Sequence, residues 1–188
     1  MEFSLINAFN ASEEIADSIN YPGIRMFTAA KVVANTPQFD VGSKQGAAGV
    51  FANSSWAVSS PAAFSPVGFS WFSAVCFLTG RDIYKALGEK VPIGLVASDW
   101  GGQAIEVFSS PDALNDKTCG GTNVTSAAAT SAIGASPQVG ARQPDVAASQ
   151  LWYAMISPFT RMRFAGVVWY QVCNSNLYHT RCSKMVIL

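Results

Sequence analysis

The chain has 188 residues, of which 49% are hydrophobic and 13% are charged. That composition is typical of a globular protein with one sizeable core and excludes a disordered chain. Twelve Lys and Arg residues balance twelve Asp and Glu residues, so we expect no nucleic-acid partner. We also expect no membrane partner, because no apolar run reaches the roughly 18 to 20 residues that a span needs.

The first predicted elements are a short helix and a short strand. Asn10 is a capping residue before Ser12–Ile19, whose acidic first turn favours a helix, and Tyr21–Gly23 favours its end. The alternating segment Ile24–Thr28 predicts a brief strand. Residues 31–68 are rich in Ser, Pro, Gly and Asn, which predicts a long surface connection.

An amphipathic helix and a buried strand come next. Apolar residues recur at three-and-four spacing over Ser70–Leu87, which predicts a helix whose aromatic side chains face the core. The stretch Val91–Glu106 predicts one strand, covered on both faces as in parallel sheets, that breaks at Gly101-Gly102. A helix that begins at this glycine pair should run to about Phe108.

The glycine pair carries the first chemical signal. Ligands bind where parallel strands end, and two glycines let the backbone approach a bound group closely. A helix start behind them would aim unpaired N–H groups at that ligand. Gly101-Gly102 is therefore an anion or oxyanion site in outline, although most such junctions are only turns.

The rest of the chain alternates loop, helix and strand. Residues 120–149 are rich in Ala, Ser, Thr and Gly, which predicts a flexible low-complexity loop. Gln150–Ile156 predicts a helix stopped at Ser157-Pro158, and Phe164–Gln171 predicts a final buried strand followed by the polar residues 174–176. We therefore expect three strands in one small parallel sheet, with helices on its faces and polar strand ends at one edge.

Cysteines and glycosylation sequons add two expectations. The four cysteines, whose spacing fits no zinc pattern, are Cys76, Cys119, Cys173 and Cys182. Cys76 lies in the predicted apolar helix, so we expect a buried free thiol there. Asn-x-Ser/Thr sequons, which hint at a lumenal origin, begin at Asn10, Asn53 and Asn123.

Several separate motifs stand in a fixed order along nearly the whole chain. They are Val91–Leu95, Trp100–Gly102, Leu151–Pro158 and Gly166–Gln171, with a further likeness over Asn10–Arg25. Together they resemble the sialate O-acetylesterase family of the SGNH (GDSL-type) hydrolases. The resemblance implies a three-layer α/β/α, flavodoxin-like fold with a parallel sheet, incomplete here, and residues 1–188 as a single partial domain of that kind.

The resemblance also implies a reaction and a set of roles. Family members use a serine in a Gly-Gln-Ser-Asn-Met-Glu segment to attack an acetyl ester, with the histidine of an Asp-x-x-His segment as base and no metal or cofactor. Backbone and asparagine amides hold the oxyanion. The implied oxyanion residues here are Gly101, Gly102, Asn174 and Asn176. Trp100, Trp169 and Tyr170 could stack on a sugar, although core packing is the commoner role for a residue such as Trp169. The expected substrate-binding residues, for an O-acetylated sialic acid or a related acetylated sugar, are Trp100, Gln103, Trp169, Tyr170 and Gln171.

The sequence departs from the family pattern in three places. Met1-Glu2 matches the end of the nucleophile segment, so we expect the chain to begin just after the serine. Gln171–Asn176 stands where the family has Gln-Gly-Glu-x-Asn, with Ser175 at the place of the asparagine. Asn174 and Asn176 lie beside it, and either could substitute only after a local register shift. The chain ends at Leu188 before any Asp-x-x-His segment, and His179 matches a non-catalytic position.

We therefore expect no catalytic residue in this chain and little or no esterase activity from it alone. The alternatives are a non-catalytic remnant that binds a sugar or a partner, and a truncated gene product. The resemblance implies a lysosomal or secreted protein, although the amino terminus lacks the features of a signal peptide. A flavodoxin-like nucleotide binder would need a Gly-rich phosphate loop, which the sequence lacks.

Other residues near the glycine pair have ordinary structural interpretations. Ser98, Ser109 and Ser110 lie outside any Gly-x-Ser-x-Gly elbow, so we expect them to be helix caps. Asp99 and Glu106 could form a carboxylate pair, but solvation or capping is the commoner role for such residues.

Overall fold

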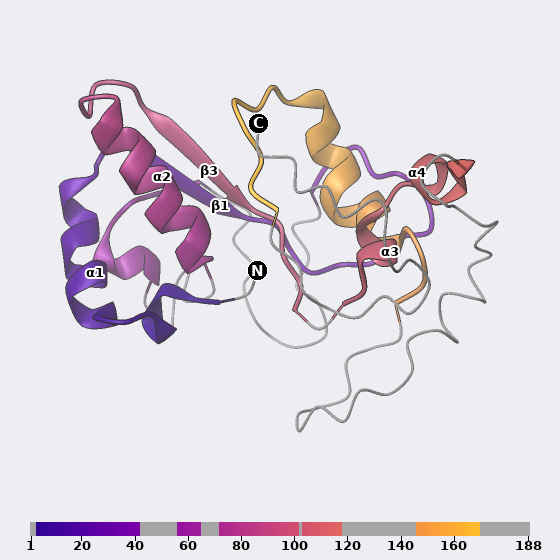
Figure 1. Ribbon diagram of the computed structural model, residues 1–188, viewed down its shortest axis with the longest axis horizontal. Helices are drawn as coiled ribbons and strands as arrows, with labels where there is room; N and C mark the ends of the chain where they lie inside the picture. The colour runs from indigo at the N-terminus through magenta and orange to yellow at the C-terminus, as the bar shows by residue number, and fades with distance from the viewer. Residues whose placement is uncertain (1–2, 42–55, 65–71, 102, 118–145, 170–188) are drawn as a thin grey trace. The chain divides into compact units, whose positions relative to one another are not determined.

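The computed structural model describes residues 3–41, 56–64, 72–101, 103–117 and 146–169 (Figure 1). The chain divides into two compact units. Unit 1 comprises Met1–Lys31 and Gly42–Gly101, and unit 2 comprises Val32–Val41 and Gly102–Leu188. The described part of unit 1 contains a sheet with helices, and that of unit 2 contains short helices.

The sheet of unit 1 has three strands in the order β2-β1-β3. The central strand β1 (Ile24–Thr28) is parallel to β3 (Ile93–Ala97), and the two are paired along their whole length. The short strand β2 (Ala57–Val58) is antiparallel to β1. The predicted strands at β1 and β3 and their parallel pairing are confirmed, but the prediction of a purely parallel sheet is wrong. β1 needs hydrogen-bond partners along its second edge, and an antiparallel segment provides them.

In the described part of unit 1, two helices and three short 3-10 turns accompany the sheet. They are α1 (Ala11–Asp17), α2 (Ala74–Ala86), η1 (Leu5–Asn7), η2 (Ser18–Asn20) and η3 (Pro61–Phe64). α1 and η2 together confirm the predicted helix near Ser12–Ile19. Ser73 caps α2 by accepting a hydrogen bond from the amide of Cys76 at 3.3 Å, so this helix begins later than the spacing of apolar residues indicates.

The core of unit 1 lies where α2 packs against the sheet, as Figure 1 shows. The aromatic side chains of α2 face this core, as predicted: Phe77 and Tyr84 are buried, and the rings of Phe64 and Phe77 lie with centroids 4.8 Å apart. A Cβ atom on Gly80 would overlap the side chain of Leu95. Gly80 therefore allows α2 to approach β3 closely.

Two predictions about unit 1 are wrong in part. Residues 56–64 are more than a surface connection, because they hold β2 and η3 and bury Phe64 in the core. The other residues of that predicted connection in this unit, 42–55 and 65–68, lie outside the described part. β3 is also less buried than expected, with Gly94 exposed. β3 is an edge strand among the described strands, and beside it the half-exposed ring of Trp56 lies 3.3 Å from where a Cβ on Gly94 would be.

Unit 2 is built from short helical segments. They are α3 (Ile105–Phe108), α4 (Pro111–Asn115), a π-helical turn η5 (Trp152–Ile156) and a 3-10 turn η6 (Ser157–Arg161). Figure 1 shows the turns of η5 beside α3. The fully buried side chains of this unit are Val107, Val146, Leu151, Ala154 and Met155.

The helix predicted at Gln150–Ile156 is confirmed, but it does not end at Ser157-Pro158. The chain continues as η6, because a proline is tolerated in the first turn of a helix, where its missing N–H is not needed. Most of the predicted loop at 120–149 lies outside the described residues. Its last residues are described, and Val146 and Ser149 are buried rather than part of a surface loop.

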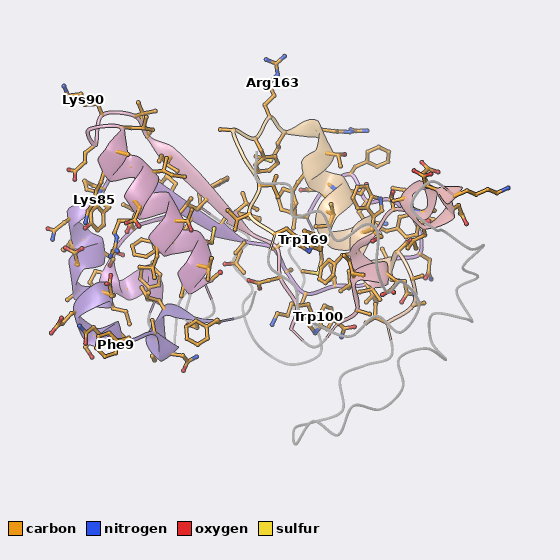
Figure 2. All side chains as sticks on the ribbon, in the orientation of Figure 1. Phe9, Lys85, Lys90, Trp100, Arg163 and Trp169 are labelled. Atoms are coloured by element: carbon orange, nitrogen blue, oxygen red, sulfur yellow. The ribbon has the colours of Figure 1, made fainter. Side chains whose placement is uncertain are left out.

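The predicted final strand is wrong over residues 164–169, which form no strand. Figure 2 shows Arg163 extending away from the ribbon, and Phe164, Val167 and Val168 after it are exposed. An apolar run becomes a strand only where a neighbouring backbone pairs with it, and no described segment pairs with this one. Tyr170 and Gln171 lie outside the described residues.

The described elements thus combine a mixed sheet with helices, which places the protein in the α/β class. Of the helices in the described part of the chain, none is long and apolar enough to cross a membrane.

Candidate functional site

The candidate site begins at the edge of the sheet where β1 and β3 both end. Because these strands are parallel and in register, their carboxyl ends lie at one edge. The amide of Ala29 donates a hydrogen bond to the carbonyl of Ala97 at 2.8 Å, which continues the pairing past β1. We call residues 29–31 and 98–101 the carboxyl edge of unit 1.

Asp99 is a buried carboxyl group at this carboxyl edge, with 7% of its surface exposed. Burial raises its pKa from 3.8 to about 6, while nearby positive charge, including that of Lys31, lowers it in part. Burial also lowers the pKa of Lys31, and the charge of Asp99 opposes that effect. The carboxyl edge therefore holds a group that titrates close to neutral pH, a property that is frequent at functional sites.

The turn predicted after β3 is confirmed at Gly101, which is half-buried beside the half-buried Trp100. Gly102 lies outside the described residues. No helix begins at the glycine pair: Ala104 has an extended backbone, and α3 begins only at Ile105 and has four residues. The prediction that a helix start aims its N–H groups at a ligand beside Gly101 is therefore wrong.

The other predicted site residues that are described belong to unit 2. Gln103 is buried. Trp169 is half-buried, and its ring stands nearly perpendicular to that of Phe108 with centroids 6.0 Å apart. Four further predicted site residues lie outside the described part of the chain: Tyr170, Gln171, Asn174 and Asn176. Ser175 and His179 lie outside it as well.

Two of the three serines have structural roles, as expected. The hydroxyl of Ser110 caps α4 by accepting from the amide of Ala113 at 3.2 Å. The hydroxyl of Ser109 does not cap a helix start, but donates to the carbonyl of Ile105 at 2.9 Å at the end of α3.

Cys76 is a free thiol, as predicted, and its Sγ lies 3.9 Å from the carbonyl oxygen of Val96. Burial raises its pKa to about 12, so this thiol is protonated at neutral pH and is a poor nucleophile.

Sequence reasoning underestimated Glu106. It is 4% exposed, and neither carboxylate oxygen has a hydrogen-bond partner within the described part of the chain. Burial raises its pKa. Asp99 belongs to unit 1 and Glu106 belongs to unit 2. The sequence does not indicate this burial, because a glutamate in the first turn of a helix usually faces solvent.

Known proteins of similar sequence indicate what kind of protein this chain is. No family model matches the chain. The sialate O-acetylesterase of Homo sapiens is 32% identical to this chain over 180 residues, which is 96% of this chain and 30% of that protein. Over nearly its whole length the chain is therefore similar to the sialate O-acetylesterase family. The sialate O-acetylesterase of Rattus norvegicus is also 32% identical, over 95% of this chain and 34% of its own length.

A solved structure agrees with this similarity. A carbohydrate acetylesterase from Xanthomonas citri superposes with a TM-score of 0.62 and 25% identity, over 92% of this chain and 30% of that one. The chain therefore spans about a third of the length of the relatives it matches. The resemblance first indicated by motifs such as Trp100–Gly102 is confirmed.

Proposed function

We propose that this chain forms part of a carboxylic ester hydrolase that removes O-acetyl groups from sialic acids or related acetylated sugars. The observation that carries the proposal is the turn at Gly101, directly after a strand of a parallel pair, in a chain 32% identical to sialate O-acetylesterases over nearly all its length. Relatives of that name and a carbohydrate acetylesterase as structural neighbour support the same class of substrate.

The proposed fold is the complete three-layer α/β/α arrangement of the SGNH hydrolases. Residues 1–188 would supply one partial domain of it. The parallel pairing of β1 and β3 and the packing of α2 on them support this proposal. The exposed sequon residue Asn10 can carry a glycan, which is compatible with the lysosomal or secreted location that we also propose.

In the proposed reaction a serine hydroxyl attacks the acetyl carbonyl carbon after a histidine takes its proton. The carbonyl oxygen becomes an oxyanion, the sugar oxygen leaves with the proton from the histidine, and water then releases acetate from the acetyl-serine. Backbone amides of Gly101 and Gly102 and side-chain amides of Asn174 and Asn176 would donate to the oxyanion. Each such donor contributes on the order of 10² to 10³ in rate.

The substrate contacts in this proposal come from aromatic and amide side chains. Trp100, Trp169 and Tyr170 would pack against the sugar, and Gln103 and Gln171 would hydrogen-bond to it.

Residues 1–188 contain neither the serine segment nor an Asp-x-x-His segment. We therefore propose that a polypeptide of these residues alone supplies oxyanion donors and sugar contacts without a nucleophile. The second candidate function, non-catalytic binding of an acetylated sugar, follows from the same features and predicts binding without acetate release.

The test measures acetate release from 9-O-acetylated N-acetylneuraminic acid by the polypeptide of residues 1–188 and by any longer protein that the same gene encodes. We expect release only from a protein that includes a Gly-Gln-Ser-Asn segment. In that protein Gly101→Pro, which removes an amide donor, should lower kcat about 100-fold, and Gly101→Ala, which keeps it, serves as control. Release by residues 1–188 that a serine-directed reagent abolishes would overturn the proposal.

A further inference from the structure

Unit 2 contains a cavity of about 420 Å³, and its described lining includes none of the proposed esterase residues. It lies against α4 and the segment that leads into η5, and it falls in the roughly 300–1,000 Å³ range of small-molecule sites. The residues that define it chemically are Asn35, Leu114, Asn115, Ser149, Gln150 and Tyr153.

Hydrogen bonds hold the wall of this cavity in one arrangement. The side chain of Gln150 donates to Oδ1 of Asn35 at 2.8 Å and accepts from the amide of Ala147 at 2.8 Å. Main-chain bonds from Ala34 to Gln150 and from Tyr153 to Ser149 fasten the same segment. Such a wall is organised before a ligand arrives, which lowers the entropic cost of binding.

Ser149 is the unusual residue of the wall. Its φ of +63° lies in the left-handed region, which costs a residue other than glycine roughly 1–3 kcal/mol and is found most often at functional sites. It is 4% exposed. Its amide donates to the carbonyl of Glu106 at 3.0 Å, but its hydroxyl has no hydrogen bond to the part of the chain that the structure describes. A strained, buried serine with an uncommitted hydroxyl therefore lines the cavity.

The other polar side chains of the cavity also keep hydrogen-bonding groups that a ligand can contact. Asn35 accepts with its oxygen, which leaves its amide N–H groups for a ligand, and Asn115 donates to the carbonyl of Pro111 at 2.9 Å, which leaves its oxygen. Tyr153 adds a half-buried ring and a hydroxyl. Among the described residues that line the cavity, none has a charged side chain.

This mixture of donors, acceptors and one aromatic ring matches a particular ligand chemistry. Sugar hydroxyls donate and accept at once, and the C–H face of a sugar packs on a ring. An anionic ligand would need Arg or Lys, and a cation would need carboxylates. We infer that this cavity binds a neutral saccharide.

Binding is tested on the 188-residue chain by ligand-observed NMR and calorimetry. The probes are the methyl glycosides of glucose, galactose, mannose and N-acetylglucosamine, with N-acetylneuraminic acid and trialanine as comparisons. We expect saturable binding of at least one methyl glycoside. Ser149→Ala and Asn115→Ala should each weaken that binding about tenfold, whereas Ser109→Ala removes a serine hydroxyl outside the cavity and should leave it unchanged.

Ser149→Gly separates strain from binding. It relieves the left-handed backbone, so we expect a higher Tm together with the same loss of affinity. Binding of none of the glycosides, preference for N-acetylneuraminic acid or trialanine, or equal losses in Ser109→Ala would each overturn the inference. Acetate release is not a readout here, so failure of the esterase proposal leaves this test intact.

Discussion

The carbonyl of Ala97 accepts a hydrogen bond of 2.8 Å from the amide of Ala29. This bond lies one residue beyond the last residue of β1. The parallel pairing therefore extends to the place where both strands lead into the carboxyl edge. Asp99, two residues after Ala97, is consequently held at the end of a fixed pair of strands. Its burial makes it the first group to test.

Asp99→Asn should flatten the pH dependence of stability. A carboxyl whose pKa is raised from 3.8 to about 6 favours folding in its neutral form, so its contribution is fully present below pH 3.8 and is lost as pH rises through 6. Relative to Asp99→Asn, the free energy of unfolding of the unmodified chain should fall by on the order of 2 to 3 kcal/mol between pH 4 and pH 7. Urea unfolding at four pH values measures this. Asp112→Asn, at an exposed carboxylate, is the control, and parallel curves for Asp99→Asn and the unmodified chain would contradict the prediction.

Tyr21→Phe should raise the pKa of Asp17. The hydroxyl of Tyr21 hydrogen-bonds to Asp17 and is the largest cause that lowers the pKa of that carboxyl, followed by Asn20. The stabilisation by ionised Asp17 is present above pH 3.8 and is lost as pH falls through its lowered pKa. Carbon-13 NMR titration of the carboxyl should show a larger upward pKa change for Tyr21→Phe than for Asn20→Ala. The reverse order would show that the tyrosine bond is not the main cause.

Phe77→Ala should cost about 3–5 kcal/mol of stability. Phe77 is fully buried and contacts the rings of Phe64 and Tyr21, so truncation leaves a cavity in the core of unit 1. Ile83→Ala, on the exposed side of the same helix, is the matched control and should cost less than about 1 kcal/mol. Chemical denaturation followed by far-UV circular dichroism measures both variants, and equal losses would place the core elsewhere.

Glu106→Met should stabilise the protein at neutral pH. The neutral form of this buried carboxyl is favoured, so its contribution is present below pH 4.5 and is lost as pH rises through its raised pKa. Replacement by an apolar side chain of similar size should raise the free energy of unfolding by roughly 1–3 kcal/mol at pH 7. Glu13→Met, at an exposed position of α1, should have almost no effect. A loss of stability in Glu106→Met would mean that the carboxylate has a favourable partner.

The parts of the fold that the sequence predicted well are those with a strong periodic signal. β1 coincides with the alternating segment Ile24–Thr28, and α2 follows the three-and-four spacing before Leu87. β2 could not be predicted, because two residues carry no periodicity. Phe164–Trp169 was wrongly predicted to be a strand, because an apolar run indicates burial but cannot say which backbone pairs with it.

The candidate site was predictable to a similar degree. The turn at Gly101 follows from the glycine pair, whereas the extended backbone of Ala104 has no sequence signal and displaced the expected helix start. Ser149 lies in a tract of small residues where nothing distinguishes it, and its left-handed backbone arises from tertiary packing. Asp99 was identified as a candidate carboxylate, but the degree of its burial required the structure.

The shortness of β2 has a consequence for the handling of this protein. In the described part of the chain, one edge of β1 is paired with the two residues of β2, and the amide of Ser59 donates one further hydrogen bond to the carbonyl of Ile24. A cover this small opens at little free-energy cost, so the β1 amides that face it should exchange with deuterium sooner than those that face β3. Each opening would offer the apolar strand Ile24–Thr28 to another molecule, and exposed strand edges pair readily. The aggregation propensity of unit 1 is therefore set by how firmly Ala57 and Val58 stay in place.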